Sequence, residues 1–580
     1  MSDRKRRSAR GWPGSASRAW TRAWTRPRSV ALLAFVCACL TLMLSAVAVR
    51  SADAQGAASG RKSYHCPDGS QPRSAGLTRG SRFVHTIHVP RDQPTIQAAV
   101  DAAKPGDLVL VAPGVYHEAV IVCTADLTIR GEDRNTTILD GQSQLANGFT
   151  VLADNVILEN MTAHHYVGNG FFWTDQTGYR GSFLTAYNNG FYGIYAFGSR
   201  LGEFDDDYAS GSPDSGIYIG QCDPCQAVIT HVKAEWNAIG YSGTNASGPI
   251  LIENSEWAHN GAGVVPNTFD TEKKAPEHSV SIINNNVHDN GDPAAPYNRG
   301  THAVIGAGIM VVGGDLNYVA HNRVSGSSTY GVLVLGNVSV NTWLASGNEV
   351  THNQVSGSGI ADLALGAPSG AGNCFSDNQA DTTLPPLLEL THPCGSPLSL
   401  NGGGDLSVTL RPLAISFNVR GPSFSPPDYR RIAAPHAQPG MPNVNTPPEP
   451  ILLDQIPTYT GAQSSAAPGG PAMLLPLGFT SYSIVQVLLS LYGNLLLFAL
   501  YSAWLAVAFV ELGQRTDLSA SRKLGWGAVA LGVPLIGPIL YYLVGGSNLS
   551  GRFRLALVVG APLFCLLATI LLMVVAYYTL

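Results

Sequence analysis

The clearest capacity for chemistry lies in a run of carboxylates in the first half of the chain. Glu203 is followed, after one Phe, by Asp205, Asp206 and Asp207, and Asp214 lies seven residues further on. Clustered carboxylates bind Ca2+ through their oxygens, or they act as acid and base on a glycosidic bond. We take these four aspartates as candidate catalytic residues and Ca2+ as a candidate cofactor. The alternative is a solvated acidic turn.

Aromatic residues are concentrated in the same part of the chain, between Tyr166 and Tyr218. Some must belong to a core, because buried aromatic side chains contribute strongly to packing. The two-residue alternation of a β-strand turns others outward, where rings beside carboxylates suit stacking against sugars. The candidate ligand-binding residues are Trp173, Tyr187, Tyr192 and His259.

Histidines recur along the chain. Imidazoles that line one face of a fold bind metal ions such as Zn2+. The alternative is that a repeat places them at equivalent exposed turns, so no metal ligand set is assigned from the sequence. The recurring residues are His164, His165, His259, His288, His321 and His352.

An internal repeat predicts how these side chains are positioned. Each copy contains Asn in a short polar phrase, and a short apolar strand follows after Gly. The copies are Leu184–Gly190, Ile252–Gly261, Ile283–Gly291, Val319–Asn322 and Val350–Asn353. From Ile252 on, they follow one another at about the length of a solenoid repeat, roughly 20–45 residues. Stacked repeats bury their apolar faces against one another, and the Asn residues fit turns whose amides hydrogen-bond along the stack.

The start of this region reads as a short helix followed by short strands. Pro94-Thr95 begins a helix with an apolar face, and Leu108–Val111 and Thr137–Leu139 are strands between turn residues. This opening and the repeats resemble the right-handed parallel β-helix family of pectate lyases and of the periplasmic maturation protein for a copper enzyme. The resemblance implies an all-β right-handed parallel β-helix over 85–380 with an N-terminal capping helix. It implies no single function, because one fold hosts many chemistries.

Six cysteines fall in the part of the chain that we expect to be exported, which predicts disulfides. We expect Cys66–Cys123 and Cys374–Cys394. Cys222-Asp-Pro-Cys225 is a C-x-x-C, a pattern that redox-active and metal-binding sites also use, and the favoured interpretation is a local disulfide on a loop. Export is predicted by a basic N-terminus, the apolar run Val30–Val49 and the small residues Ala52-Asp53-Ala54. Residues 1–54 are a signal peptide or an uncleaved anchor, and 55–84 form a linker.

The C-terminal part is predicted to hold the β-helix on a membrane. Residues 381–480 are rich in Pro and read as a stalk. Residues 481–580 contain three apolar segments, Ser483–Val510, Trp526–Val544 and Leu555–Tyr577, each long enough to be a transmembrane helix. Basic residues between the first two favour a cytoplasmic loop there, an extracytoplasmic β-helix and a cytoplasmic C-terminus.

The first two of these segments carry a second resemblance. Glu511–Asp517, Lys523–Trp526 and Pro534–Tyr542 resemble the N-terminal membrane module of phospholipase D-type and cardiolipin synthase proteins. Those enzymes need the motif H-x-K-x4-D twice, whereas here His231-Val-Lys233 is followed by Ala238 at the Asp position and has no second copy. The module is therefore expected to be an anchor without lipid chemistry.

The leading hypothesis is a membrane-anchored extracellular β-helix that binds a polysaccharide, with a cell-membrane location and no nucleic acid partner, since the net charge is -5. Three rivals stay open. One is a carbohydrate-active enzyme, a lyase, hydrolase or epimerase that uses the aspartates. Another is a structural or adhesive surface protein, and the last is a metal-delivery protein that uses the histidines.

Overall fold

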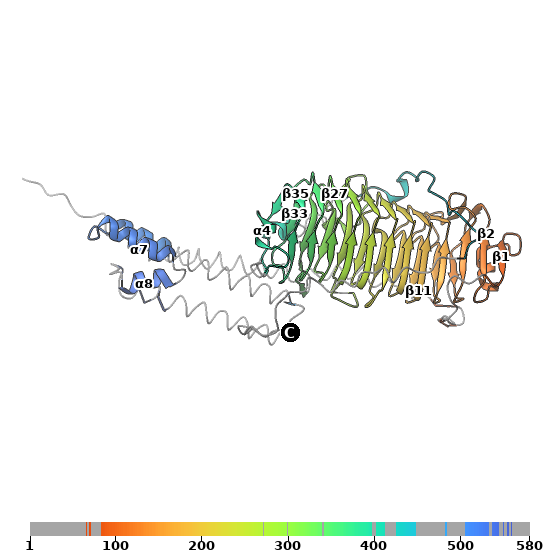
Figure 1. Ribbon diagram of the computed structural model, residues 1–580, viewed down its shortest axis with the longest axis horizontal. Coiled ribbons are helices and arrows are strands. Elements are labelled where there is room, and N and C mark those ends of the chain that lie inside the picture. Colours follow the sequence, from red (N-terminus) through yellow and green to blue (C-terminus); the bar gives the residue numbers. More distant parts are fainter. Residues whose placement is uncertain are drawn as a thin grey trace, which may run out of the picture. The chain divides into compact units, whose positions relative to one another are not determined.

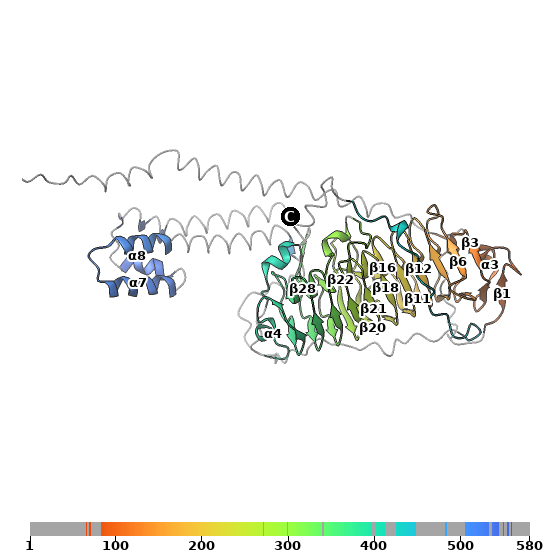
Figure 2. The ribbon, with the colours of Figure 1, turned by 90° about the horizontal axis from the view of Figure 1, so that it is seen from above.

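The computed structural model describes the central body and parts of the C-terminal region. Described are residues 65–66, 69–70, 73, 83–447 except 271, 299, 339–340, 397–401 and 412–424, then 482–483 and 505–559 except 533–535, 545–548, 550–553 and 556–557. The central body is a β-helix made of three parallel sheets (Figures 1 and 2), as the repeats predicted.

Each coil of the β-helix contributes one strand to each of three sheets, which we name A, B and C. Sheet A contains β1 (Thr86–Val89), β2 (Leu108–Val111), β5 (Thr128–Gly131), β8 (Val156–Glu159), β11 (Thr177–Ser182), β14 (Arg200–Asp205), β17 (Ala227–Thr230), β20 (Ser247–Glu253), β23 (His278–Ile283), β26 (Tyr318–Ala320), β31 (Glu349–Thr351) and β34 (Cys374–Ser376). Sheet B contains β3 (Gly114–Tyr116), β6 (Thr137–Asp140), β9 (Thr162–His164), β12 (Thr185–Tyr187), β15 (Tyr208–Ser210), β18 (Lys233–Glu235), β21 (Glu256–Ala258), β24 (Asn286–His288), β27 (Arg323–Ser325), β32 (Gln354–Ser356) and β35 (Gln379–Ala380). Sheet C contains β4 (Val120–Val122), β7 (Phe149–Val151), β10 (Phe171–Thr174), β13 (Ile194–Phe197), β16 (Ser215–Gly220), β19 (Ile239–Thr244), β22 (Ala262–Asn267), β25 (Ile309–Val312), β28 (Tyr330–Leu335), β33 (Ala361–Leu365) and β36 (Thr383–Leu384).

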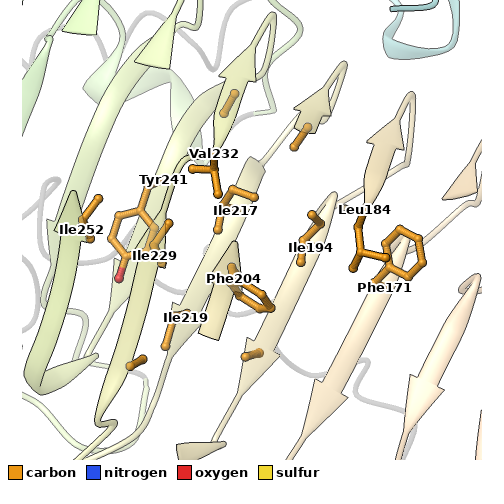
Figure 3. Packing of buried hydrophobic residues seen from close by; sticks show 14 of the residues in the cluster. Phe171, Leu184, Ile194, Phe204, Ile217, Ile219, Ile229, Val232, Tyr241 and Ile252 are labelled. Atoms are coloured by element: carbon orange, nitrogen blue, oxygen red, sulfur yellow. The ribbon is translucent and has the colours of Figure 1, made fainter. Parts of the chain in front are cut away.

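The core is built from inward side chains that stack from coil to coil. On sheet A, Phe204, Ile229 and Ile252 are partners in register, and all three are fully buried. On sheet C, Phe171 and Ile194 continue the same kind of stack (Figure 3). Because strand residues alternate between two faces, the residue next to each of these points outward. The register therefore decides which side chains can meet a ligand.

Asn residues stabilise the turns between the strands, as expected. In the turn from sheet A to sheet B, Oδ1 of Asn322 accepts the backbone N–H of Asn285, and Oδ1 of Asn353 accepts that of Asn322. A second ladder in the turn from sheet B to sheet C includes Asn237 and Asn260. These buried amides satisfy backbone groups that the turns leave without a ladder partner.

Both ends of the stack are closed. Helix α3 (Ile96–Ala102) covers the first coils, and the side chain of its N-cap residue Thr95 accepts the N–H of Ala98. Helix α4 (Leu388–Thr391) lies against the last coils. All three expected disulfides are present, and they join Cys66 to Cys123, Cys222 to Cys225 and Cys374 to Cys394.

Part of the predicted stalk lies on the β-helix instead of extending from it. Residues 425–447, which we call the strap, run along the early coils (Figure 2). The backbone carbonyls of the strap accept hydrogen bonds from the solenoid: Asn188 binds Ile432, Arg134 binds Pro439, and Arg130 binds both Val444 and Thr446. A Pro-rich segment suits this role, because it exposes carbonyls without needing a hydrogen-bonding partner strand.

The described C-terminal residues include two helices and the short strand β37 (Tyr482–Ser483). Helices α7 (Ala520–Gly532) and α8 (Ile536–Val544) contact each other, with the ring of Trp526 5.9 Å from that of Tyr541. Among the described residues, none of the helices combines the length and apolar character needed to span a bilayer. The expected single transmembrane segment 526–544 is divided between these two helices, and residues 533–535 lie outside the described residues. Val30–Val49 and most of the other two expected segments lie outside the described residues.

Candidate functional site

The outer face of sheet C carries a row of aromatic rings on three successive strands. Phe172 in β10, Tyr195 in β13 and Tyr218 in β16 are partners in register, one residue beyond the inward Phe171, Ile194 and Ile217. The rings of Phe172 and Tyr195 stack with centroids 4.6 Å apart, and the rings of Tyr195 and Tyr218 meet edge to face at 4.9 Å.

Tyr192 joins this row from the turn that leads into β13. Its ring lies 4.4 Å from that of Tyr195 and 4.8 Å from that of Tyr218. Tyr192 and Tyr195 are half-buried, whereas Phe172 and Tyr218 are buried beneath their neighbours. We call these four residues the aromatic cluster. It offers a partly exposed apolar surface with phenol hydroxyl groups, against which a sugar can pack.

Asp214 lies at the start of β16, beside the aromatic cluster. Its carboxylate accepts hydrogen bonds from Nδ2 of Asn298 at 3.1 Å and from the Ser215 hydroxyl at 3.1 Å. Burial raises the pKa of Asp214 to about 6, and these two hydrogen bonds partly oppose the shift. A carboxyl group with such a pKa exists in both protonation states near neutral pH, which is what a general acid or base requires.

Two loops border the outer face of sheet C near the aromatic cluster. Asn298, from the loop between β24 and β25, holds Asp214 at the start of β16. The loop between β22 and β23 crosses the other end of the sheet, where Asn245 donates to the carbonyls of Phe269 and Lys273. Burial raises the pKa of Tyr192 well above its usual value, and the negative charges of Asp214 and Glu272 add to the shift. Each loop thus brings a polar group towards the aromatic cluster.

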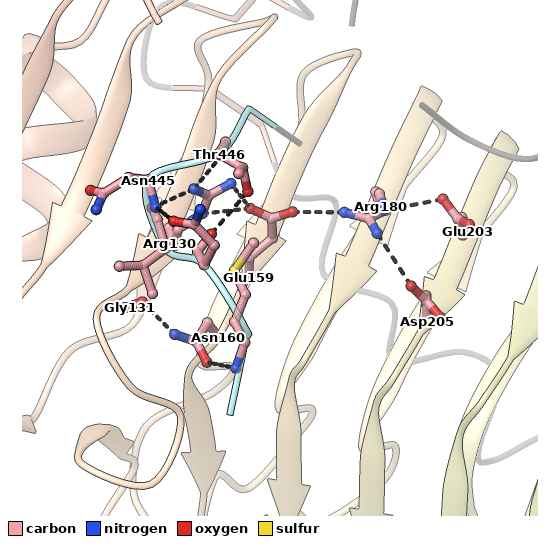
Figure 4. Close-up of polar contacts among 12 residues, drawn as sticks. Arg130, Gly131, Glu159, Asn160, Arg180, Glu203, Asp205, Asn445 and Thr446 are labelled. Carbon is pink, nitrogen blue, oxygen red and sulfur yellow. Dashed lines mark hydrogen bonds and ion pairs between the residues drawn. The ribbon is translucent and has the colours of Figure 1, made fainter. Parts of the chain in front are cut away.

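The acidic run 203–207 does not form one catalytic group, contrary to the simplest interpretation of the sequence. Arg180 binds Glu203 at 3.0 Å and Asp205 at 3.3 Å, and its guanidinium also meets Glu159 at 2.7 Å (Figure 4). Arg130 binds the other side of Glu159 at 2.6 Å. This row of charges on the outer face of sheet A is almost fully buried, and the strap carbonyls at Arg130 complete it. Asp205 thus belongs to a structural ion-pair network.

Asp206 and Asp207 turn away from Asp205, so residues 205–207 offer no shared Ca2+ site. Asp206 occupies the turn after β14 with φ +55°, and burial together with the Asp205 charge raises its pKa. Asp207 is 2% exposed and its Oδ1 accepts the N–H of Leu184 at 2.7 Å. That bond is the one that an Asn makes in other coils, so Asp207 is a ladder residue. Burial raises its pKa well above the usual value.

The four candidate ligand-binding residues lie in different places. Trp173 is in the core with no exposed surface, and its indole N–H faces the carbonyl of Val156 at 3.3 Å, so it cannot contact a ligand. Tyr187 stacks on His164 at the outer face of sheet B. His259 lies parallel to the ring of Trp236 in a turn. Only Tyr192 belongs to the aromatic cluster.

Sequence reasoning missed Phe172, Tyr195 and Tyr218 as site residues. The sequence contains a pattern that predicts two of them: Gly193-Ile194-Tyr195 and Gly216-Ile217-Tyr218 place an outward Tyr after an inward Ile in successive repeats. Glu272 carried no such signal, because it lies in a loop that only folding brings near Tyr192.

Comparisons with known families confirm both resemblances seen in the sequence. Residues 169–384 match the family described as right handed beta helix region, which also gives the hand of the solenoid. Residues 502–546 match the family described as phospholipase D-nuclease N-terminal. No curated protein matches the chain by sequence.

Solved structures with a similar architecture have very different sequences. DFA-IIIase from Arthrobacter chlorophenolicus A6 in complex with GF2 has a TM-score of 0.34 and 12% identity, covering 47% of this chain and 83% of that chain. The Dettilon tailspike protein has a TM-score of 0.36 and 12% identity, covering 51% and 68%. Alginate lyase from Paenibacillus sp. str. FPU-7 has a TM-score of 0.32 and 15% identity, covering 52% and 99%. At such values the similarity does not assign a function.

Proposed function

We propose that this protein binds an extended, neutral polysaccharide along the outer face of sheet C. The observation that carries the proposal is the aromatic cluster, whose rings repeat from strand to strand as the sugar units of a polymer do. Strands of one sheet lie about 4.8 Å apart, so three of them span about the length of two sugar rings. The nearby carboxylates Asp214 and Glu272 disfavour a polyanion and accept hydrogen bonds from sugar hydroxyls.

Binding is tested with the full-length protein in detergent on a glycan array and with soluble polysaccharides, a neutral glucan and polygalacturonate. We expect the glucan to bind and Tyr195→Ala to weaken this binding about 5- to 30-fold, since stacking and burial of one ring contribute on the order of 1–2 kcal/mol and 1.4 kcal/mol is a factor of ten. Tyr318→Ala, on the outer side of sheet A, is the matched control and should bind as wild type. Equal affinity of both variants would sink the proposal, as would absence of binding to every glycan.

A second candidate is a carbohydrate-active enzyme, and the observation that favours it is Asp214. A carboxyl group with pKa near 6, beside rings that can hold a sugar, suits the acid of a glycosidase. Asp214→Asn should then abolish product release while leaving glycan binding intact. If wild type releases no more product than this variant, the protein is a binding protein and not an enzyme.

The C-terminal region is the candidate anchor within the same proposal. The match of residues 502–546 to a phospholipase D-nuclease N-terminal family and the apolar segments of 481–580 support it. The full-length protein should stay in the membrane pellet after an alkaline carbonate wash, and residues 55–480, which lack the apolar segments at both ends, should be in the soluble fraction. Release of the full-length protein by the same wash would count against an integral membrane anchor.

A further inference from the structure

Three side chains with metal-binding atoms converge at the outer edge of sheet B, away from the aromatic cluster. Asp140 ends β6, His164 ends β9, and His165 follows His164 in the turn. His164 lies directly opposite Asp140 in the strand register. The ligand atoms of the three residues all lie within 4.8 Å of one another, and the three side chains are half-buried.

The backbone explains how two adjacent residues can face the same point. Neighbours in a strand point to opposite faces, but His165 has left the strand and adopts φ +54°. This left-handed conformation brings its ring alongside that of His164, and the two Nδ1 atoms are 2.7 Å apart. Oδ1 of Asp140 is 3.5 Å from Nδ1 of His164.

Groups outside the triplet hold both imidazoles in place. Nε2 of His165 lies 3.4 Å from the carbonyl oxygen of Arg430 in the strap. When the N–H of this nitrogen donates a hydrogen bond to the carbonyl, the lone pair of the neutral ring is on Nδ1, which faces His164. Tyr187 stacks on the ring of His164 at 4.6 Å. A backbone carbonyl behind a histidine ligand is the usual means of fixing its tautomer and orientation at metal sites.

We propose that Asp140, His164 and His165 bind a divalent transition-metal ion of the Zn2+ type. With metal–nitrogen bonds of about 2.0–2.1 Å, ligand atoms of a tetrahedral site lie about 3.3 Å apart. The pair His164–Asp140 already has that spacing, and the two rings need to part by about 0.6 Å. Two imidazoles and one carboxylate match Zn2+ and its neighbours, whereas Ca2+ and Mg2+ prefer oxygen ligands.

His117 lies beside the site, on the neighbouring coil. Its Nδ1 is 3.2 Å from the backbone carbonyl oxygen of Asp140 and 3.7 Å from Oδ2 of the same residue. Three protein ligands leave the fourth position of a tetrahedral site for water. Loss of His117 should therefore weaken Zn2+ binding less than loss of His164 or His165.

A second group, His259, His288 and Asp289, also has converging ligand atoms, but its members already have separate partners. His288 binds Asp289 at 2.8 Å and lies 3.5 Å from Glu256, and His259 pairs with Asp292 at 3.4 Å. Asp289 is exposed. Asp140, His164 and His165 are all half-buried, and a strap carbonyl lies behind His165, which favours them as the site that binds first and makes His288 a suitable control.

The test is titration of the chelator-treated full-length protein in detergent with Zn2+ alone, followed by calorimetry, and with Co2+, followed by visible absorption. We expect one tight site per chain and the absorption bands of tetrahedral Co2+. His164→Ala and His165→Asn should each weaken Zn2+ binding at least about 100-fold, beyond the 10–100-fold typical of outer-shell groups. Asn is chosen at position 165 because it tolerates positive φ.

His288→Ala serves as the control and should bind Zn2+ as tightly as wild type. Circular dichroism without metal should be the same for all four proteins, which separates loss of the site from loss of the fold. A distorted spectrum for His164→Ala leaves His165→Asn as the deciding variant. The proposal is overturned if wild type binds neither ion, if both site variants bind like wild type, or if only His288→Ala loses binding.

Discussion

Replacing Asn322 by Ala should open the β-helix locally, because this side chain joins three successive coils. Asn322 is 1% exposed in the turn between β26 and β27. Its Oδ1 accepts the backbone N–H and the Nδ2 of Asn285, both at 3.0 Å. Its Nδ2 donates to the carbonyl of Ile282 at 2.8 Å and to Oδ1 of Asn353 at 3.0 Å. Ala removes all four of these hydrogen bonds.

The cost follows from which groups are left without partners. The buried N–H of Asn285 loses the acceptor that the turn provides, which costs about 1–3 kcal/mol, and each of the other three bonds contributes about 0.5–1.5 kcal/mol. We therefore expect a loss of about 4 kcal/mol. In a solenoid each repeat contacts only its neighbours, so the loss should be confined to a few coils.

Hydrogen exchange followed by mass spectrometry measures this local effect. A loss of about 4 kcal/mol corresponds to exchange about 1000-fold faster in peptides that contain Asn285, since 1.4 kcal/mol is a factor of ten. Peptides from the first coils, near Ile129, should be unchanged. Arg323→Ala, at the next and exposed position, is the control. Protection around Asn285 that is equal in the two variants would refute the assignment of the ladder as a stabilising element.

Three further variants test other parts of the β-helix. Asp207→Asn should stabilise the protein by about 1–3 kcal/mol at pH 8, because the amide keeps the acceptor and removes a buried charge. Because burial raises the pKa of Asp207, the protonated side chain stabilises the folded protein below the pKa of the unfolded state, and this stabilisation is lost as the pH rises through the pKa of the folded state. The stability advantage of the Asp207→Asn variant over wild type, measured by urea titration, should therefore shrink at acidic pH. Arg180→Met should cost about 3–5 kcal/mol in the same assay, since it leaves Glu159 with half of its buried partners; a cost below 1 kcal/mol would contradict the ion-pair network. Gly202→Ala should lower the free energy of unfolding by about 1–3 kcal/mol, because a Cβ there would lie 1.8 Å from the ring of the buried Tyr179. An unchanged melting temperature would contradict that packing.

The sequence predicted the solenoid because its signals are local and repeated. Pairs such as His321-Asn322 and His352-Asn353 mark the same turn in successive coils, and the amides stack there as expected. The capping helix after Thr95 and the disulfide partners were also predicted correctly. Each of these features needs only the residue type and its neighbours in the chain.

The acidic run shows where such reasoning stops. Asp206-Asp207 occupies the turn position of His321-Asn322, with positive φ at the first residue of each pair and a ladder hydrogen bond at the second. When the coil boundaries are unknown, Asp205, Asp206 and Asp207 look like one cluster. In the structure, strand alternation and the turn point the three side chains in different directions. The number of neighbouring carboxylates in the sequence therefore does not predict a shared catalytic or metal site.

The strap was beyond the reach of the sequence, because its contacts come from backbone carbonyls of Pro-rich residues that carry no periodic pattern. Its position bears on where a ligand can bind. The strap carbonyls satisfy Arg130 and Arg134, so the adjoining outer face of sheet A and the turn into sheet B are occupied in the early coils. On the outer face of sheet C, Tyr195 and the neighbouring Tyr192 keep part of their surface exposed in those same coils. A polymer that follows the stacked coils would therefore meet aromatic rings on sheet C. On sheet A it would first have to displace the hydrogen bonds between the strap and buried charges. Variants of the aromatic cluster therefore test polysaccharide binding better than variants of the acidic run.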